Sequence, residues 1–438
     1  MPDTFLERTH GNSSPNGRKG TISVWVKRTE LGSNQYILGN YNNANNYGYL
    51  KFDQNDNLTH YSNWDTDLQL VTNMKFRDLS GWYHIVLSVD TTQSTASDRL
   101  KLYVNGVEPS YSTTNYGNQN TTNYLFQASA SGGHRIGSQQ TTQHHFGGLM
   151  SHFHFIDGTA YPASTFGSTD STTGEWKINT NPTVTYGSQG YFMFKNDNSL
   201  SDDSGNGNNF IVGNGTLTKS EDNPSNVFST MNFLNRTSSA ISYTNGNTTI
   251  SYPGTWVFSL GNMGVSSGKW YWEAKVNSGN NANSYYGICA EMVPAGNGFY
   301  NNSQNGAIMY AAGDSGDTYI DGSYTSGAQT PQNKNTDILG LALDLDSGTK
   351  TLKIYKNGTQ LTSGGTVNLS SYYNDTVVFP CFSGNSSSAS CSFNVNFGNG
   401  YFGTTAVSSA GTNASGNGIF EFDVPAGYTA ISTKGLNL

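Results

Sequence analysis

The sequence predicts an all-β protein in which two antiparallel β-sandwich (jelly-roll) domains follow one another in tandem. The chain has 438 residues, a length that suits two hydrophobic cores better than one. Its composition, with 51 glycines and only 12% charged residues, is poor in the side chains that favour helices. Short segments alternate apolar and polar residues with period two, and turn residues separate them.

The first half of the chain contains five such segments, and each is expected to form a half-buried antiparallel strand. They are TISVWV (21–26), WYHIVLSVD (82–90), LKLYV (100–104), SHFHFI (151–156) and YFMF (191–194). The second half continues in the same style. Its expected strands are WYWEAKV (270–276), YYGICAEM (285–292), ILGLALDLD (338–346), LKIYK (352–356), VVFPCF (377–382), SFNVNF (392–397) and IFEFDV (419–424). Many short strands without a helical period are typical of sandwiches and jelly rolls.

Two segments end in nearly the same way, with LKLYVNG at 100–106 and LKIYKNG at 352–358. In each, Asn-Gly supplies the two positive-φ positions of a type I′ hairpin turn. The likeness stops there, because no segment of the second half matches SGWYHIVLSVD and none of the first matches GKWYWEAKV. We therefore interpret it as shared turn chemistry in two different domains.

The β signal is weakest between residues 165 and 235, where Ser, Thr, Asn, Gly and Pro dominate. This pattern predicts a first domain at residues 1–170 and a second domain at residues 233–438. Residues 171–232 are expected to be a connecting segment whose strands pack on the first domain.

Charge and hydropathy exclude several classes of partner. The formal net charge is −8 without a basic cluster, which argues against nucleic acid and anionic membranes. No run of about 18 apolar residues occurs, so membrane insertion is not expected. The N-terminal segment lacks the apolar core and cleavage site of a signal peptide, so we expect synthesis in a host cytoplasm. Three cysteines are too few for a disulfide framework, and free thiols are expected.

The order of motifs resembles two known families. TISVWVKR, GWYHIVLSVD, LKLYVNGVE and RIGSQ…FGGLMSHFHFIDGTAY, at about 21–161, resemble the laminin G-like jelly rolls of the concanavalin A-like superfamily. GKWYWEAKV, YYGICAE, ILGLALDLDSGTKTLKIYKNG, VVFPCFSG and FNVNFG follow the order of a SPRY domain. IFEFDVPAGYTAI resembles the closing strand of that domain and the turn after it, with residues 401–416 as an inserted loop.

Three further segments, FIDGTAYPASTFG (155–167), LSDDSGNGNNF (200–210) and EDNPSNVFSTMN (221–232), complete a third resemblance. Together with the two folds they are similar to structural proteins of tailed bacteriophages, especially marine ones. The resemblance implies a virion surface protein, a tail fibre or appendage, that attaches to host cell-surface glycans and contacts other virion proteins. A capsid or tail decoration protein and a polysaccharide depolymerase are the alternatives, and homo-oligomerisation is left open.

A candidate binding surface consists of aromatic residues in Asn-rich segments that we expect to be polar loops between strands. Aromatic rings stack on sugar rings, and neighbouring Asn and Asp side chains bond to hydroxyl groups. The alternative is that these tyrosines only pack the loops onto the sandwich. The candidates are Tyr41, Tyr47, Tyr49, Tyr61 and Trp64 in the first half, and Tyr300, Tyr310, Tyr319 and Tyr324 in the second.

Two acidic loops are candidate calcium sites, since calcium takes about six to eight oxygen ligands. The first contains Asp202, Asp203, Asn206 and Asn208, and it resembles a loop of laminin G-like jelly rolls, some of which bind calcium. The second contains Asp314, Asp317 and Asp321. The alternative is that both are solvated turns whose side chains satisfy the local backbone. No other cofactor is expected.

Catalysis is not expected. A retaining glycosidase places two carboxyl groups about 5 Å apart, and the closest sequence match is Glu421 and Asp423 in FEFDVPA. Ala426 stands where a related glucanase pattern has its acid/base glutamate. We interpret this stretch as a structural strand of a non-catalytic protein.

The histidines of HHFGGLMSHFHF, residues 144–155, could be metal ligands if a hairpin brought them together. The preferred interpretation is that Phe153 and Phe155 fill the core while His152 and His154 face solvent. No acidic or cysteine ligand completes a metal set nearby.

Overall fold

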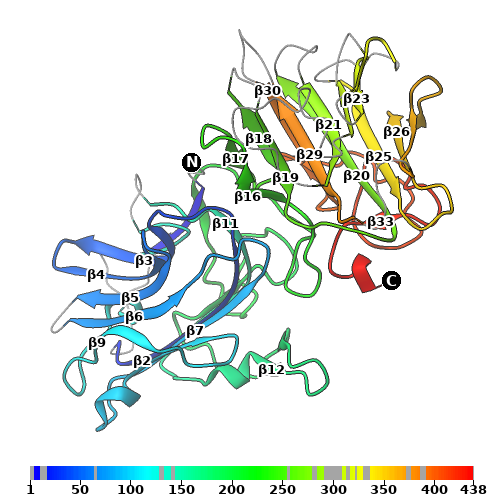
Figure 1. Cartoon of the computed structure of the whole chain (residues 1–438). Helices are drawn as coiled ribbons and strands as arrows, with labels where there is room; N and C mark the ends of the chain where they lie inside the picture. Colours follow the sequence, from blue (N-terminus) through cyan, green and yellow to red (C-terminus); the bar gives the residue numbers. More distant parts are fainter. Residues whose placement is uncertain are drawn as a thin grey trace. The chain divides into compact units, whose positions relative to one another are not determined.

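The structure is a computed structural model of the chain, and it divides into two compact units, Met1–Lys219 and Ser220–Leu438 (Figure 1). Residues 220–232, which we expected in the connecting segment, therefore belong to the second unit. The described residues are 4–9, 17–63, 67–127, 133–139, 144–253, 257–278, 284–290, 316–320, 323–328, 336–370, 376–384 and 391–437, with the backbone alone at 308–311.

One sheet of the first unit has five strands in the order β14-β11-β2-β7-β8. The strands are β2 (Lys19–Arg28), β7 (Tyr83–Asp90), β8 (Leu100–Val104), β11 (Gly148–Asp157) and β14 (Tyr191–Met193). They are the five strands predicted for the first half, so the prediction is confirmed for this sheet.

The other sheet of the first unit has eight strands in the order β15-β1-β10-β3-β4-β5-β6-β9. They are β1 (Phe5–Thr9), β3 (Gln35–Asn43), β4 (Asn46–Phe52), β5 (Asn57–Asn63), β6 (Leu68–Lys75), β9 (Tyr111–Asn115), β10 (Gly133–Ile136) and β15 (Ile211–Asn214). Strands β3 to β6 form a meander in the Asn- and Tyr-rich region where we expected polar loops. That expectation is wrong because Gly48, Leu50 and Phe52 alternate inward along β4 while polar side chains point outward.

The core of the first unit lies between these two sheets. Ile22 and Val24 of β2 and Phe153 and Phe155 of β11 pack with Leu50 of β4, and each is at most 1% exposed. Phe153 and Phe155 therefore occupy the core positions that alternation assigned to them. The side-chain period of two turns the neighbours of these residues to the outer faces of the sheets.

The outer face of the five-stranded sheet is covered by the segment that follows β11. This segment contains η3 (Ala163–Thr165) and a two-stranded ribbon of β12 (Gly167–Thr169) and β13 (Trp176–Ile178). His154 lies beneath it, 1% exposed, with its ring 3.9 Å from that of Phe192 and Nδ1 2.8 Å from Tyr186 Oη. The expectation that His154 faces solvent is therefore wrong.

The second unit also contains two large sheets, with seven strands in the order β16-β19-β29-β21-β22-β23-β24 and nine strands centred on β30-β20-β25-β26. The first comprises β16 (Met231–Arg236), β19 (Val257–Gly261), β21 (Ser284–Cys289), β22 (Ile308–Ala311), β23 (Thr318–Ile320), β24 (Ser323–Thr325) and β29 (Phe379–Gly384). The second comprises β17 (Ser242–Thr244), β18 (Thr249–Tyr252), β20 (Lys269–Ser278), β25 (Ile338–Asp344), β26 (Thr351–Lys356), β27 (Thr359–Gln360), β28 (Thr366–Asn368), β30 (Cys391–Asn396) and β33 (Thr429–Ala430). A short ribbon pairs β31 (Tyr401–Phe402) with β32 (Thr405–Ala406), and the remaining 3-10 turns are η1 (Ala96–Asp98), η2 (Tyr124–Phe126) and η6 (Gly435–Asn437).

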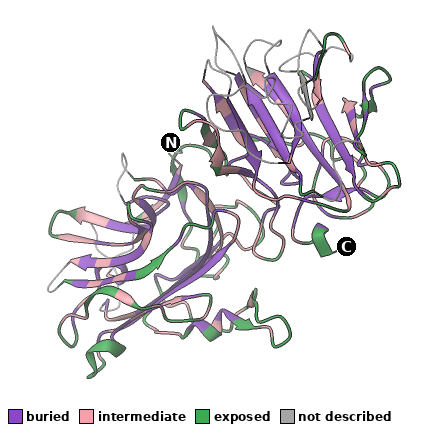
Figure 2. Cartoon of the chain, in the orientation of Figure 1, coloured by how far each residue is buried: buried purple, intermediate pink, exposed green. Residues whose placement is uncertain are grey.

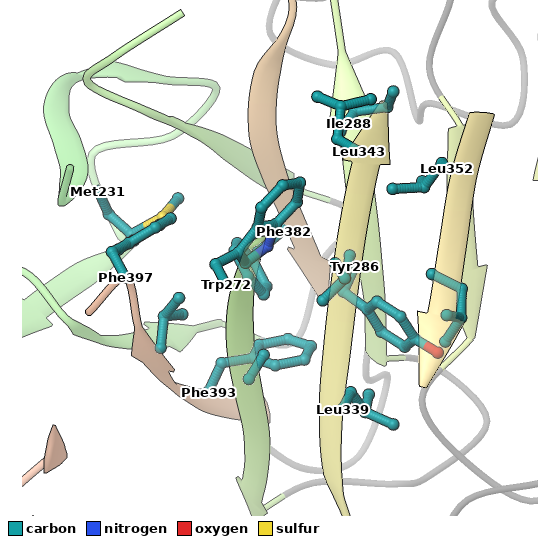
Figure 3. Packing of buried hydrophobic residues seen from close by; sticks show 14 of the residues in the cluster. Met231, Trp272, Tyr286, Ile288, Leu339, Leu343, Leu352, Phe382, Phe393 and Phe397 are labelled. Atoms are coloured by element: carbon teal, nitrogen blue, oxygen red, sulfur yellow. The ribbon is translucent and has the colours of Figure 1, made fainter. Parts of the chain in front are cut away.

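The core of the second unit fills the space between its sheets (Figure 3). Trp272 on β20 is fully buried near Phe382 and Phe393, whose rings lie 5.2 Å apart. The three cysteines are buried free thiols, as expected, and the central strands are buried along most of their length (Figure 2).

One predicted strand of the second unit is absent. Residues 419–424 form an isolated bridge at Ile419 instead of a strand. The backbone N–H groups of Glu421 and Phe422 instead donate to the buried carboxylate of Glu273, at 2.9 and 3.0 Å. A side chain of the sheet thus replaces a neighbouring strand as the partner of this backbone.

The two Asn-Gly hairpins are built alike. Asn105 and Gly106 have φ values of 47° and 81°, and Asn357 and Gly358 have 48° and 79°, as a type I′ turn requires. Each asparagine Oδ1 also accepts from the backbone N–H of a residue on the preceding strand, His84 for Asn105 at 2.8 Å and Ile338 for Asn357 at 2.9 Å. The shared sequence therefore serves one local structure in two sandwiches.

Candidate functional site

Three of the four outer sheet faces bury apolar clusters. Besides the covered five-stranded sheet, the nine-stranded sheet buries Tyr271 and Ala342 against Phe420. On the seven-stranded sheet, Phe258 and Leu260 of β19 point away from the core and belong to a separate buried apolar cluster on the outer face. On the eight-stranded sheet, the outer face has no such cluster among the described residues and carries tyrosines instead.

We call Tyr41 on β3, Tyr47 and Tyr49 on β4, and Tyr61 on β5 the tyrosine face. Tyr41 is the cross-strand partner of Tyr47, and Tyr49 is the partner of Tyr61. All four side chains are partly exposed, and buried and intermediate residues alternate along β4 (Figure 2). The tyrosines therefore lie on a rigid sheet and not on the loops we expected.

The rings of the tyrosine face support one another. The ring centre of Tyr47 lies 6.2 Å from those of Tyr41 and Tyr49 and 5.4 Å from that of Tyr61. Tyr49 and Tyr61 are stacked at 5.6 Å. Tyr49 is stacked on both Tyr47 and Tyr61, whereas Tyr47 is tilted against Tyr41 and Tyr61, so the four rings pack as one group. Such a group is preorganised, because few side-chain rotations remain to be lost on binding.

Polar side chains continue the tyrosine face across the sheet. Gln69 on β6 is the cross-strand partner of Tyr61, and Asn115 on β9 is the partner of Gln69. Asn63 stands opposite Tyr47. These amides carry both donors and acceptors beside the phenol hydroxyls, which is the combination that a polyhydroxylated ligand needs.

Burial raises the pKa of three phenols on this side of the sheet. It raises the pKa of Tyr49 and of Tyr61 well above the usual value, with hydrogen bonds to Asp67 and Tyr47 adding to the effect at Tyr61. Burial also raises the pKa of Tyr36, beside Tyr49, to about 12. The hydroxyls of Tyr36, Tyr49 and Tyr61 are therefore neutral at physiological pH and can donate as well as accept.

One cation lies at the end of the tyrosine face. Lys51 follows Tyr49 on the same side of β4, and its Nζ is 4.7 Å from the ring centre of Tyr49 and 5.0 Å from that of Tyr36. Sequence reasoning missed Lys51, Gln69 and Asn115. The period-two alternation of YGYLKF at 47–52 is the signal that would have placed Lys51 with the tyrosines.

The remaining aromatic candidates are only partly described. Trp64 and Tyr300 lie outside the described residues, and only the backbone of Tyr310 is described, in β22. Tyr319 and Tyr324 are cross-strand partners on β23 and β24 at an edge of the seven-stranded sheet, with ring centres 5.0 Å apart. Tyr324 is 52% exposed. This pair is smaller than the tyrosine face and is a second candidate surface.

The first candidate calcium loop is held together by its own hydrogen bonds. Asp202 accepts from the backbone N–H of Phe192, Ser204 and Asn208 and from the Ser204 hydroxyl, all at 2.8–2.9 Å. The Nδ2 groups of Asn206 and Asn208 both donate to the carbonyl of Gly190. Asp203 adjoins Asp202, and its backbone N–H donates to Phe192. The turn alternative accounts for these contacts, and calcium binding stays a prediction.

The second candidate loop contributes one described residue. Asp317 Oδ1 accepts from the backbone N–H of Gly327, whereas Asp314 and Asp321 lie outside the described residues. Within the described part of the chain, no group of three His, Cys, Asp or Glu side chains is arranged to hold a metal ion.

A serine and a histidine approach each other under the segment that covers the five-stranded sheet. Ser23 Oγ lies 2.9 Å from His84 Nε2, and Trp176 Nε1 lies 2.9 Å from His84 Nδ1. The indole can only donate, so His84 Nδ1 must be the acceptor and Nε2 carries the proton. His84 then donates to Ser23, which is the opposite of what activation of a serine nucleophile requires. Burial lowers the pKa of His84 to about 3, so this arrangement persists over the physiological range.

The carboxylate pair at 421 and 423 is engaged by the inserted loop. Glu421 accepts from the backbone N–H and the hydroxyl of Ser408, and Asp423 accepts from the backbone N–H and the hydroxyl of Thr412. These contacts hold residues 408–412 against residues 421–423. The pair has a structural role in positioning this loop.

Comparison with known families finds one matching domain in each half of the chain. Residues 7–164 match Laminin_G_3, the concanavalin A-like lectin/glucanases superfamily, and residues 269–400 match the SPRY domain. A concanavalin A-like domain and a SPRY domain therefore lie in tandem, as the resemblance implied. No curated protein matches this chain.

Several solved structures are similar at low sequence identity. The SPRY domain of human HERC1 is 18% identical with a TM-score of 0.31, over 38% of this chain and 96% of that one. Domain 4 of AbnA, an extracellular arabinanase from Geobacillus stearothermophilus solved with arabinotriose, is 21% identical with a TM-score of 0.28, over 36% of this chain and 68% of that one. A heptameric pentraxin from Limulus polyphemus is 16% identical with a TM-score of 0.28, over 41% of this chain and 86% of that one. Among the described residues, no helix has the length and hydropathy to cross a membrane.

Proposed function

We propose that this chain is a non-catalytic saccharide-binding protein whose tyrosine face holds the ligand. The tandem of a concanavalin A-like domain and a SPRY domain supports the proposal. A single observation carries the proposal. Among the outer faces of the four large sheets, only that of the eight-stranded sheet presents a stack of partly exposed tyrosines, the tyrosine face, without a buried apolar cluster over it among the described residues. Stacked tyrosines beside Gln69 and Asn115 offer ring surface and directional hydrogen bonds together, which suits a sugar chain lying across the strands.

The biological setting that we propose is the surface of a tailed-bacteriophage virion, where the protein acts as a tail fibre or appendage component. The support is the resemblance of residues 155–167, 200–210 and 221–232 to such proteins, together with the tandem of lectin-type and SPRY domains. In that setting many copies would bind host cell-surface glycans weakly, and multivalency would supply the strength of attachment. Other virion proteins would be its second class of partner.

A second candidate function is decoration of the capsid or tail, in which the SPRY domain binds another virion protein. The exposed edge pair Tyr319 and Tyr324 favours this alternative, because a partly exposed aromatic pair at a sheet edge suits a protein contact. Immunogold labelling of intact particles would separate the two, since decoration predicts many copies over the shell and attachment predicts label at the tail.

The proposed binding is tested by screening the purified chain on a glycan array with two variants of the tyrosine face and one control variant. Tyr47→Ala and Tyr61→Ala should each weaken saccharide binding about tenfold or more, whereas Tyr324→Ala should leave it intact. Reducing-end release from host polysaccharide would contradict the non-catalytic proposal. Equal binding by Tyr61→Ala and the unaltered chain would contradict the assignment of the tyrosine face.

A further inference from the structure

Lys51 is a cation in an aromatic setting without an ion-pair partner in the described part of the chain. None of the ion pairs found there includes Lys51. Its Nζ donates to Asn34 Oδ1 at 3.0 Å and lies 3.5 Å from Tyr36 Oη. An ammonium group has three donors, so at least one remains for a ligand.

Another cation on the same side of the sheet is neutralised. Arg135 on β10 stands opposite Gly39, which in turn stands opposite Tyr49, so it belongs to the same transverse row as the tyrosines. Its Nε is 3.3 Å from Glu7 Oε2. Lys51, in contrast, is a positive charge that packs directly against the tyrosine face.

The carboxylates near Lys51 have other hydrogen bonds. Asp53 acts on Lys51 only through space, and its Oδ1 accepts the backbone N–H groups of Asn55 and Asn57. Asp67 interacts with Tyr61, on the neighbouring strand. His144 stacks on Tyr36, and its interaction with Lys51 lowers the pKa of the histidine further below the value that burial sets. It is therefore neutral at physiological pH and adds no second charge.

Partial burial makes the charge of Lys51 more effective. The tyrosine rings displace water from the ammonium group, and this desolvation lowers the pKa of Lys51. A charged hydrogen bond made in such a setting is stronger than one made in open water. A carboxylate or sulfate that approached Lys51 would restore the solvation that the rings removed.

We infer that the tyrosine face selects acidic saccharides, with Lys51 as the residue that recognises the uronate, sialate or sulfate group while the tyrosines hold the sugar rings. This inference rests on the proposed saccharide binding and specifies its ligand class. A neutral glycan would leave the ammonium group partly desolvated without compensation, so it should bind more weakly than its acidic counterpart.

The test is a set of immobilised saccharides in acidic and neutral pairs, including polygalacturonate with its methyl ester and sialylated and sulfated oligosaccharides with their unmodified forms. The unaltered chain should bind the acidic member of a pair about tenfold more tightly. Lys51→Gln should lose this preference and Lys51→Arg should keep it. Lys101→Gln, at a lysine on β8 that pairs with Asp98, is the matched control and should behave like the unaltered chain.

Each outcome bears on the inference separately from the proposed function. Tyrosine-dependent binding without preference for acidic members, or a preference that survives Lys51→Gln, would overturn the inference and leave the proposed function standing. Absence of any saccharide binding that depends on Tyr61 would overturn both. Rising ionic strength should weaken acidic-saccharide binding by the unaltered chain more than by Lys51→Gln.

Discussion

The hairpin after β8 in the first unit and the hairpin after β26 in the second are alike down to the asparagine that bonds to the preceding strand. The outer sheet faces of the two units are not alike. In the second unit both faces bury apolar clusters, whereas in the first the eight-stranded sheet leaves its tyrosines partly exposed. The comparison teaches that a local motif reports how a strand pair is closed, while function follows from what an outer face leaves uncovered.

The two units also differ in their buried ionisable groups. His60 and His84 are buried in the first unit, and all eight histidines of the chain precede residue 155. The second unit buries Glu273, which accepts from Tyr271 and from the backbone of Glu421 and Phe422. Burial keeps His60 and His84 neutral. Glu273 has the only fully buried carboxylate side chain among the described residues.

The largest expected difference between the units is their response to acid. Burial lowers the pKa of His60 to about 4, against 6.5 in the unfolded chain, so the unfolded state binds more protons between these values. The contribution of His60 to the stability of the first unit is full above about pH 6.5 and is lost as the pH drops toward 4. Burial raises the pKa of Glu273 to about 7, so its contribution is full below about pH 4.5 and declines as the pH rises toward 7.

Calorimetry across pH 4.5–6.5 checks this difference. The transition of the first unit should move to higher temperature as the pH rises, while the Glu273 contribution moves that of the second unit the other way. His60→Gln should reduce the slope of the first unit, to which the buried His84 and His154 also contribute, and should leave that of the second unit unchanged. Parallel movement of both transitions would contradict the distinction between buried histidine and buried glutamate.

Among single substitutions, Trp272→Ala should have the largest effect on stability. Trp272 is 0% exposed between the sheets of the second unit, and its loss should lower the free energy of unfolding by about 3–5 kcal/mol. Trp272→Phe keeps a ring and should cost less. Saccharide binding by the first unit, measured below the melting temperature of the variant, should be unchanged. A loss of saccharide binding together with the loss of stability would contradict the assignment of saccharide binding to the first unit alone.

Glu273→Gln comes next. An amide offers one acceptor oxygen where the carboxylate offers two, so one of the N–H groups of Glu421 and Phe422 loses its acceptor. We expect a loss of about 1–3 kcal/mol, measured by chemical denaturation at a pH above 8, where Glu273 is ionised. Glu421→Gln, which affects an exposed contact to Ser408, is the matched control and should cost much less. A variant as stable as the unaltered chain would show that Glu273 does not hold the backbone of residues 421 and 422 in place.

Tyr61→Ala should separate binding from stability. Its side chain is partly exposed, so the free energy of unfolding should change by no more than about 1 kcal/mol. Saccharide affinity, measured by titration calorimetry, should fall about tenfold or more because the stack loses a member. Tyr103→Ala, at a partly buried tyrosine on β8 of the other sheet, is the control for loss of a ring alone. A large stability loss with unchanged affinity would favour a packing role for the tyrosine face.

Calcium should have the smallest effect. Because both oxygens of Asp202 already accept hydrogen bonds, adding calcium or a chelator should leave the thermal transition of the first unit unchanged. Asp202→Ala should lower that transition in either condition. A rise in melting temperature with calcium that Asp202→Ala abolishes would instead establish the calcium site.

The strand pattern of the sequence predicts every strand of one sheet of the first unit and no strand of the other. Strands such as β2 and β7 alternate Val and Ile with polar residues, whereas β4 alternates tyrosine with glycine and leucine. Counting Tyr, Asn and Gly as loop residues hides a pleated strand whose outer face is polar. In the same way, IFEFDV has strand alternation, but its backbone bonds to Glu273, a tertiary contact that no local pattern encodes.

The candidate site was predictable as a set of residues but not as a place. Tyr41, Tyr47, Tyr49 and Tyr61 could be chosen by residue type, and cross-strand pairing then brings them together. The covering of His154 could not be foreseen, because it depends on where residues 159–190 pack. Exposure of an aromatic residue is decided by such distant segments, and therefore by tertiary structure.

The most direct test of the tyrosine face is ¹⁹F NMR of the chain labelled with fluorotyrosine, with resonances assigned by single Tyr→Phe variants. Addition of a saccharide selected from the array should shift the signals of Tyr41, Tyr47, Tyr49 and Tyr61 and leave those of Tyr319 and Tyr324 in place. Shifts confined to Tyr319 and Tyr324, with the four signals of the tyrosine face unmoved, would contradict the account.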